Sequence, residues 1–404
     1  MPVKERLIPI FIVVFVDILG FSIILPLLPF YASKIHAADS SVGPLIASYS
    51  LCQFIAAPIL GNLSDTYGRR PVLLYSQLGS LLGFILLGLA MRLPHPLAWL
   101  FAGRMIDGLS GGNLTVAQAY ISDITEPRER AKTFGMIIGV SFGLGFTIGP
   151  GLGAIISSRF GYDITAYLAA FFSLSSIIAT FLLLPETQHH RDEARLRGLA
   201  MYTRVVNYLR IVELRPLLAV FFFMALPFTI YTTMFPLFAK NQLGFDVRHA
   251  GYFLALVGLL GVIWQGGLIG PIVKRFGEHK SMIIGLAASA AGLYYITAVD
   301  VWWKLIPVAI LFSFGHSVSR PSLTSLIAQA APPNRRGGVF GAMTSIESMT
   351  RIIGPLLGGW IITTQPRWVG WVGGALFTAA ALIGSTIRSS ETRYDLIDDR
   401  LSNE

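Results

Sequence analysis

The sequence predicts an all-α membrane protein with twelve transmembrane helices, arranged as two pseudo-symmetric six-helix bundles. Three observations lead to this fold class: apolar residues in runs of span length, a repeat of the first half in the second, and an uneven distribution of basic residues. Of the 404 residues, 53% are hydrophobic and only 13% are charged, whereas soluble domains average about 25% charged. This composition excludes an ordinary soluble domain.

The apolar runs are roughly 20 residues long, which is the length a helix needs to cross about 30 Å of hydrocarbon. Each run must be helical, because the bilayer offers no water to satisfy exposed backbone groups. The first run begins a few residues after Met1, is too long for a signal-peptide core and lacks a cleavage site, so we expect it to be retained. The predicted spans are 7–30, 43–62, 72–91, 97–120, 134–157, 163–184, 216–239, 249–271, 281–299, 303–328, 338–362 and 369–387.

The chain contains a tandem repeat. GNLSDTYGRR at 61–70 returns as GPIVKRFGEHK at 270–280, with both pairs of aligned glycines 209 residues apart. PRERAKTFG returns as PNRRGGVFG, LPFYASK as FPLFAKN, and GFTIGPGLG as TRIIGPLLGG, so that four places share offsets of 205–209. Such repeats place two parallel halves about an axis along the membrane normal, with the binding site at their interface.

The repeat sets the expected domain boundaries. Residues 1–185 form the N-terminal bundle and 216–388 the C-terminal bundle. The charged segment 186–215 lacks an apolar run of span length, which predicts a cytoplasmic linker with a short amphipathic surface helix at 199–212. The polar, acidic tail at 389–404 is expected to be disordered.

Basic residues are distributed unevenly across the predicted membrane. Of the 31 Lys and Arg, 21 fall on the side that carries both termini, seven on the opposite side, counting Lys304 at the edge of its span, and three deeper inside spans. This is the positive-inside pattern, so both termini are expected in the cytoplasm. The net charge of +9 then serves topology and contact with anionic lipids, and no nucleic-acid partner is expected. The single cysteine, Cys52, excludes an internal disulfide, and no cofactor or metal site is predicted.

The pattern Gly-x-Leu-x-Asp-x-x-Gly-Arg-Arg at 61–70 resembles the signature loop of the major facilitator superfamily, and the resemblance covers nearly the whole chain. It implies a transporter whose loop latches the two halves on the cytoplasmic side in one state and releases them in the other. The gating candidates in this loop are Gly61, Asp65, Gly68, Arg69 and Arg70.

Each of these residues also has a physical role by itself. Gly61 and Gly68 permit close approach and a tight turn. Asp65 can accept hydrogen bonds from the N-terminus of the third helix or pair with an arginine. Arg69 and Arg70 are expected to anchor the loop at the cytoplasmic surface, where they also enforce topology. The second copy has Lys274 in place of the aspartate, so the two loops cannot act identically.

A second resemblance is to the drug–proton antiporters of the tetracycline-efflux type, carried by 16–29, 100–135 and 143–153. Gly145, Gly149 and Pro150 match the glycine–proline signature of antiporters, with Ala154 as a mild departure. Small residues four apart let helices approach closely, and a proline bends its helix by removing a backbone hydrogen bond. These residues are further gating candidates, although generic helix packing would also explain them.

Charged residues inside spans are the strongest functional candidates, since each costs at least about 2.5–3.5 kcal/mol at mid-bilayer. Asp17 lies ten residues into the first span and has no partner in its own helix, so it should face a cavity or a neighbouring helix. Two pairs have intrahelical ion-pair spacing, which is also typical of purely structural pairs. They are Arg104 with Asp107, and Glu347 with Arg351.

The resemblance suggests proton-coupling chemistry for these groups. A carboxyl group in apolar surroundings favours its neutral form, and a neighbouring arginine favours the charged form. Asp17 or Asp107 is therefore expected to take a proton on one side and release it on the other, with Arg104 supplying the positive charge. The driving force is roughly 1.4 kcal/mol per pH unit plus about 2.3 kcal/mol per 100 mV for one charge.

One departure concerns the substrate. Span 281–299 has no acidic residue where tetracycline-type exporters carry one, and Asp300 lies at its end. The substrate is then expected to be another amphipathic drug or a metabolite instead of a metal–tetracycline complex. His316 and Arg320 share one face of span 303–328. The candidates for lining the substrate cavity, each of which plain packing would also explain, are Phe21, Gln53, Gln118, Tyr231, Phe235, His316 and Ser345.

Two functions remain open at this point, and others are disfavoured. The first is proton-coupled export of amphipathic small molecules from a bacterial inner membrane; the second is proton-coupled or facilitated transport of a metabolite. A sensor would need a folded extramembrane domain, and an enzyme would need a catalytic motif; neither is apparent in the sequence. The expected partners are a small-molecule substrate, protons and membrane lipids, and we expect a monomer.

Overall fold

The computed structural model describes residues 3–126, 129, 133–187, 214–331 and 336–387, and the regular elements within these ranges are all helical. The predicted surface helix at 199–212 and the tail at 389–404 lie outside the described residues. The helices of the first half are α1 (Val3–Ile24), α2 (Leu28–Lys34), α3 (Val42–Tyr67), α4 (Arg69–Leu89), α5 (Pro96–Ser110), α6 (Asn113–Ile124), α8 (Val140–Phe160) and α9 (Tyr162–Leu183). Those of the second half are α11 (Leu214–Leu243), α12 (Val247–Ile263), α13 (Ile269–Ile296), α14 (Leu305–Ala330), α15 (Arg336–Thr364) and α16 (Trp368–Ser385).

Every predicted span lies on helical backbone, with differences where glycine occurs. The span predicted as one helix at 97–120 is instead two helices, because α5 ends before Gly111 and α6 begins after Gly112. Conversely, the helical backbone is continuous from α12 through a π-helical turn at Trp264–Leu268 into α13. Gly277 inside α13 has φ 73°, a left-handed conformation that separates the eighth span from the ninth.

Eight of the described helical stretches are long and apolar enough to cross a bilayer by length and composition. One of them, Val247–Ile296, contains both the eighth and the ninth predicted spans. The predicted spans 97–120, 303–328 and 338–362 are not among the eight. The first of these is the interrupted α5–α6 pair, and the other two carry Arg320 and the Glu347–Arg351 pair.

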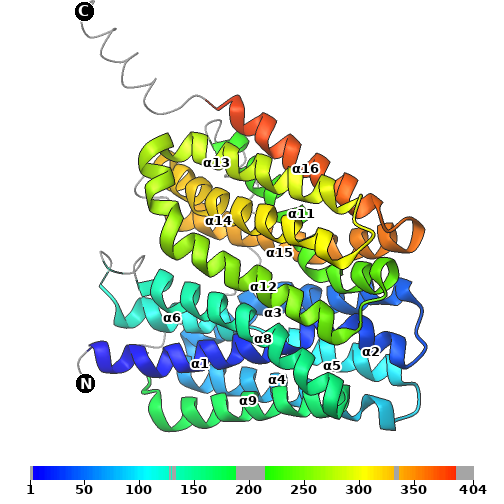
Figure 1. Cartoon of the computed structure of the whole chain (residues 1–404). Helices are drawn as coiled ribbons and strands as arrows, with labels where there is room; N and C mark the ends of the chain where they lie inside the picture. Colours follow the sequence, from blue (N-terminus) through cyan, green and yellow to red (C-terminus); the bar gives the residue numbers. More distant parts are fainter. Residues whose placement is uncertain (1–2, 127–128, 130–132, 188–213, 332–335, 388–404) are drawn as a thin grey trace, which may run out of the picture.

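The helices pack in the same pattern in the two halves. In the first half α1 packs against α8 and α9, and α4 against α5 and α9; in the second half α11 packs against α15 and α16, and α13 against α14 and α16. Figure 1 shows the first half in blue to green and the second in green to red, with their helices nearly parallel. Between the halves, α8 meets α12 and α3 meets α15. The repeat aligns α3 with α12 and α8 with α15, so each of these two contacts maps onto the other, as a pseudo-two-fold axis requires.

The two ends of the bundle differ. We call the end with the start of α1 and the finish of α16 the termini end, and the other the far end (Figure 1). At the far end a side chain on Gly43 of α3 would lie 2.5 Å from the Pro355 carbonyl oxygen of α15. There Lys240 also pairs with Asp39 at 3.1 Å across the halves. The halves are therefore closed against each other at the far end.

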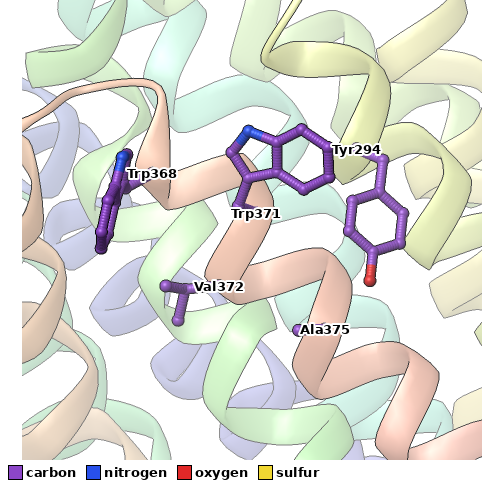
Figure 2. Close-up of a pocket in the computed structure, with 5 residues that line it drawn as sticks. All are labelled: Tyr294, Trp368, Trp371, Val372 and Ala375. Atoms are coloured by element: carbon purple, nitrogen blue, oxygen red, sulfur yellow. The ribbon is translucent and has the colours of Figure 1, made fainter.

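A broad apolar hollow of about 840 Å³ lies on the outer face of α13 and α16 at the far end. Figure 2 shows Trp368 and Trp371 projecting from α16, with the Tyr294 ring beside Trp371. Trp302, Trp303 and Trp360 are exposed near this end as well. Tryptophan and tyrosine collect where membrane meets water, and the lining of this hollow has that composition.

Candidate functional site

The candidate site is a cavity of about 90 Å³ between helices of the first half, to which the second half contributes Arg351. We call it the central cavity. It contains several of the charged and polar residues singled out in the sequence, including one from α15. Its lining includes Asp17 and Phe21 of α1, Tyr49 and Gln53 of α3, Asp107 of α5, Asn113 of α6 and Arg351 of α15.

Asp17 faces this cavity from the middle of α1. The neutral side chains of Ser176, Gln77 and Asn113 surround its carboxyl group. Gln77 Nε2 donates to Ser176 Oγ at 2.7 Å, which ties α4 to α9 beside the carboxyl group. No Lys or Arg within the described ranges forms an ion pair with Asp17. The acid therefore sits among groups that tolerate both of its protonation states.

Arg104 and Asp107 form an ion pair of 3.1 Å between Arg104 Nη1 and Asp107 Oδ2, with side-chain exposures of 1% and 4%. The Arg104 guanidinium also lies 4.2 Å from the centre of the Tyr49 ring, a cation–π contact that partly replaces water. Ser80 of α4 lines the same cavity as Asp107. Gly83 allows α4 to approach Asp107 closely, because a side chain there would lie 2.8 Å from the Asp107 Cβ.

Gln53 hydrogen-bonds the glycine segment that interrupts the fourth predicted span. Its Nε2 donates to the Gly111 carbonyl oxygen at 2.8 Å and to the Tyr49 hydroxyl at 3.1 Å. Phe21 packs on the same Tyr49, with ring centres 5.2 Å apart. Both predicted lining residues therefore lie at the central cavity, and both also position Tyr49.

The other predicted lining residues lie elsewhere. Tyr231 and Phe235 of α11 are buried in an aromatic cluster of the second half, with the Tyr231 ring 4.1 Å from Phe312. His316 stacks on Phe228 at 3.7 Å, and its Nδ1 has no partner among the described residues. Ser345 bonds within its own helix to Gly341, and Gln118 is partly buried on α6.

The second half carries a three-residue charge cluster. Glu347 of α15 accepts hydrogen bonds from Arg320 of α14 at 3.0 and 3.1 Å, and from Arg351 at 3.1 Å. The predicted Glu347–Arg351 pair is therefore present, but it is joined by Arg320, which the spacing on α15 alone does not indicate. The cluster links α14 to α15 and, through Arg351, reaches the central cavity.

The loop at 61–70 forms a compact charge network at the termini end. Arg69 pairs with Asp65 and, at 2.9 Å, with Asp123 of α6. Arg69 is buried, with 7% of its surface exposed, so it ties α3 to α6 instead of lying on the surface as expected. Arg70 lies over the Phe181 ring and donates to the Phe181 carbonyl oxygen.

Glu186 belongs to this network, although the sequence patterns did not indicate it. Its carboxylate accepts the backbone N–H groups of Arg69 and Arg70 at 2.9 and 3.1 Å, and so satisfies the N-terminus of α4, as a capping side chain does. Gly68, with φ 105°, turns the chain so that these N–H groups point at it. The sequence signal for this contact is weak: one acidic residue after the sixth span.

The glycine–proline motif packs α8 on both sides. Towards α1, a side chain on Gly145 would lie 2.7 Å from Ile18, and one on Gly153 would lie 2.7 Å from the Ile23 carbonyl oxygen. Towards the other half, Ala154 and the Pro150 carbonyl oxygen lie against Gly251 of α12. Gly149 lies directly on Ser22 of α1. The departure at Ala154 thus has a glycine partner across the interface.

Comparison with known proteins gives a consistent assignment. The family model described as Major Facilitator Superfamily matches residues 10–269 and 266–395. The chain is 32% identical to the tetracycline resistance protein, class C, of Escherichia coli over 363 residues, 88% of this chain and 89% of that protein. It is 26% identical to multidrug resistance protein 2 of Bacillus subtilis (strain 168), with 86% of each chain covered. The crystal structure of a POT family transporter in complex with 5-aminolevulinic acid superposes with TM-score 0.76 at 14% identity, over 96% and 98% of the two chains, and so shares the fold.

Proposed function

Because this chain belongs to the major facilitator superfamily, whose members are multi-pass membrane transporters and not enzymes, we propose that it exports amphipathic small molecules in exchange for protons. Its relatives named for resistance to tetracycline and to multiple drugs support export of this substrate class. The distribution of basic residues supports both termini in the cytoplasm, and the relatives from Escherichia coli support a bacterial inner membrane location.

Asp17 is the proposed proton-binding group, and the surroundings of this carboxyl group are the observation that carries the proposal. The acid faces the central cavity, and the groups around it are the neutral side chains of Ser176, Gln77 and Asn113. Amide and hydroxyl groups can donate to a carboxylate and can also accept from a carboxylic acid. The site therefore needs no rearrangement of charged partners to gain or lose one proton.

The Arg104–Asp107 pair has a supporting role in this scheme. Asp107 lines the same cavity as Asp17, so the charges of Asp107 and Arg104 act on the Asp17 carboxyl group with opposite signs. Any movement of α5 that alters the contact between Arg104 and Asp107 changes this balance. In the proposal, the pair thereby transmits the conformation of the first half to the proton site.

Alternating access requires the halves to separate at each end in turn. Pockets for drug-sized ligands have volumes of about 300–1,000 Å³, whereas the central cavity has about 90 Å³, so the halves must part to admit such a ligand. The far-end contacts of Gly43 and Lys240 close one entrance. At the other entrance the ion pairs of Asp65, Arg69 and Asp123 lie within the first half in this state, and the proposed latch to the second half forms there when that entrance closes.

A second candidate is transport of a polar metabolite by the same route. The polar groups of Gln53, Asn113 and Ser173 in the cavity lining favour it. A single tightly bound polar compound would identify this function, whereas acceptance of several unrelated amphipathic compounds would identify an exporter.

The test uses inverted membrane vesicles with an acid interior, in which loss of the pH gradient is followed while cationic, zwitterionic and anionic amphipathic compounds are added. We expect compound-dependent proton release by the wild type and none by Asp17→Asn. Asp300→Asn is the matched control, since this acid is 60% exposed beside Lys304 and should not matter. Release that survives in Asp17→Asn would move the proton site to Asp107 or Glu347. Substrate flux down its own gradient without any release would contradict antiport.

A further inference from the structure

The charge cluster of Arg320, Glu347 and Arg351 differs from the other charged pair inside the bundle. The side chains of Arg104 and Asp107 are 1% and 4% exposed, whereas those of Arg320, Arg351 and Glu347 are 41%, 35% and 24% exposed. The second-half cluster on α14 and α15 is thus more accessible than the first-half pair.

The cluster also has an excess of positive charge and of hydrogen-bond donors. Two guanidinium groups face one carboxylate, which leaves a formal charge of +1. The contacts to Glu347 use the Nη2 atom of each arginine, although a guanidinium carries five N–H donors in a planar fork. Both arginines therefore keep donors with which to bind a second planar anion.

Arg351 connects this excess charge to the central cavity. It lines the cavity that Asp17 also lines, together with the Phe21 and Tyr49 rings. Arg320 lies one turn from His316, which is stacked on Phe228. Aromatic surfaces thus flank the arginines on both halves, as an amphipathic ligand with a charged end would require.

We propose that Arg320 and Arg351 bind a carboxylate group of the substrate, and that Glu347 occupies this place when no substrate is present. The inference rests on the proposed function and specifies its substrate class as aromatic carboxylates, including zwitterions that carry this group. An arriving carboxylate shares or replaces the two-oxygen contact that Glu347 makes with Arg320. Guanidinium groups match carboxylates with paired, nearly parallel hydrogen bonds.

Glu347 then acts as an internal competitor, which gives the proposal a distinctive consequence. Removing its charge should strengthen binding of substrate carboxylates, because two arginines are left without their counter-ion. Removing either arginine should weaken binding by about tenfold or more, the effect expected for lost hydrogen bonds to a charged group. If the cluster only fastened α14 to α15, no variant would distinguish carboxylates from other compounds.

The binding test uses purified full-length protein in detergent and measures the shift of its thermal unfolding midpoint. The probes are 1-naphthoate, its methyl ester and 1-naphthylmethylamine, with the corresponding anthracene set as a larger series. We expect only the carboxylates to stabilise the wild type, at lower concentration in Glu347→Gln and at much higher concentration in Arg320→Lys and Arg351→Lys. Arg92→Gln is the matched control, since Arg92 pairs with Asp163 at the far-end surface. The double variant Glu347→Gln/Arg351→Gln removes one charge of each sign and so leaves the net charge of the cluster unchanged. It is measured in place of a single variant that does not fold.

Stabilisation by the amine or the ester to the same extent, no stabilisation by any probe, or unchanged carboxylate binding in the arginine variants would overturn the inference. Proton release in vesicles separates it from the proposed function. A carboxylate that binds through the arginines but releases no protons supports this site and contradicts antiport. Release driven by amines alone supports antiport and overturns this site.

Discussion

Arg104 Nη1 donates to Asp107 Oδ2 at 3.1 Å in a pair that is almost completely buried. Arg104 also has two buried nitrogen atoms, Nε and Nη2, without a partner among the described residues. Such a pair gains little net stability from its formation, because both ions lose their hydration. The stability of the fold alone therefore does not account for a charged pair at this depth beside Asp17. Because both ions are buried, the effect of removing one charge depends on whether the other charge is still present.

The first prediction concerns this interdependence. Asp107→Asn leaves the Arg104 charge buried and uncompensated, so it should destabilise the protein by about 3–5 kcal/mol. The double variant Arg104→Met/Asp107→Leu should lose much less, because no unpaired charge remains. Reversible unfolding of the purified protein in detergent would measure both. Equal losses in the single and double variants would mean that the pair contributes mainly through packing.

The second prediction compares the repeated glycines Gly68 and Gly277. Both have positive φ, 105° and 73°, so alanine at either position should cost about 1–3 kcal/mol of backbone strain. A side chain at Gly68 would in addition lie 2.5 Å from a Glu186 carboxylate oxygen, whereas one at Gly277 would meet open space.

Both alanine variants should therefore lower the thermal unfolding midpoint, but Gly68→Ala should impair transport more, because it displaces the cap of α4. Vesicle transport at equal protein amounts is the measurement. If Gly277→Ala impaired transport as much, the Glu186 contact would have no special role.

The third prediction concerns closure at the far end. Asp39→Asn removes the ion pair with Lys240, and Gly43→Val would force α3 away from the α15 backbone. Both changes should favour the state that is open at this end, Gly43→Val more strongly, since a partly exposed ion pair contributes only about 0–1 kcal/mol.

The reporter for this opening is a cysteine at Ser173, which lines the central cavity, in a Cys52→Ala background. A membrane-impermeant maleimide added on the far-end side should label it faster in both variants. Asp163→Asn, which breaks a pair within one half, is the control and should leave the rate unchanged. Equal rates in all variants would show that these contacts do not close the entrance.

The fourth prediction is a pH dependence outside the membrane spans. Partial burial favours the neutral form of the Asp246 carboxyl, but hydrogen bonds from the His249 backbone N–H and ring outweigh it and hold the pKa of Asp246 below its ordinary value. Because the pKa is depressed in the folded state, the carboxylate stabilises the start of α12 above about pH 4, and this contribution is lost as the pH falls further.

Asp246→Asn retains a capping side chain without the titration. Its unfolding midpoint should consequently decline less than that of the wild type between about pH 5 and pH 3. The difference should be small, since the side chain is 58% exposed. A steeper decline in the variant would contradict this assignment.

The sequence predicted the features that depend on neighbouring residues. The Arg104–Asp107 and Glu347–Arg351 pairs follow from spacings of three and four on a helix, and the spans follow from length and composition. The contacts Arg320–Glu347 and Glu186–Arg69 join residues that are 27 and 117 positions apart. Such contacts depend on how helices are rotated against each other, and a single sequence does not contain that information in readable form.

Tyr231 and Phe235 illustrate the same difficulty. A soluble helix reveals its buried face by a polar stripe on the opposite side. In a membrane, faces towards lipid, towards the neighbouring helices and towards an amphipathic cavity are all largely apolar, so the pattern does not separate them. These two residues were predicted to line the cavity, and in the structure they are buried in the second half.

The glycine and alanine faces of α8 have a mechanical consequence. One face lies against Ile18, Ser22 and Ile23 on the helix that carries Asp17, and the other lies against Gly251 of the opposite half. Contacts made by backbone and short side chains have few rotamers to absorb a displacement. A shift of α1 on protonation would therefore be passed by α8 to the opposite half as a nearly rigid movement. The coupling between proton binding and substrate binding would then depend on the small side chains at these α8 positions.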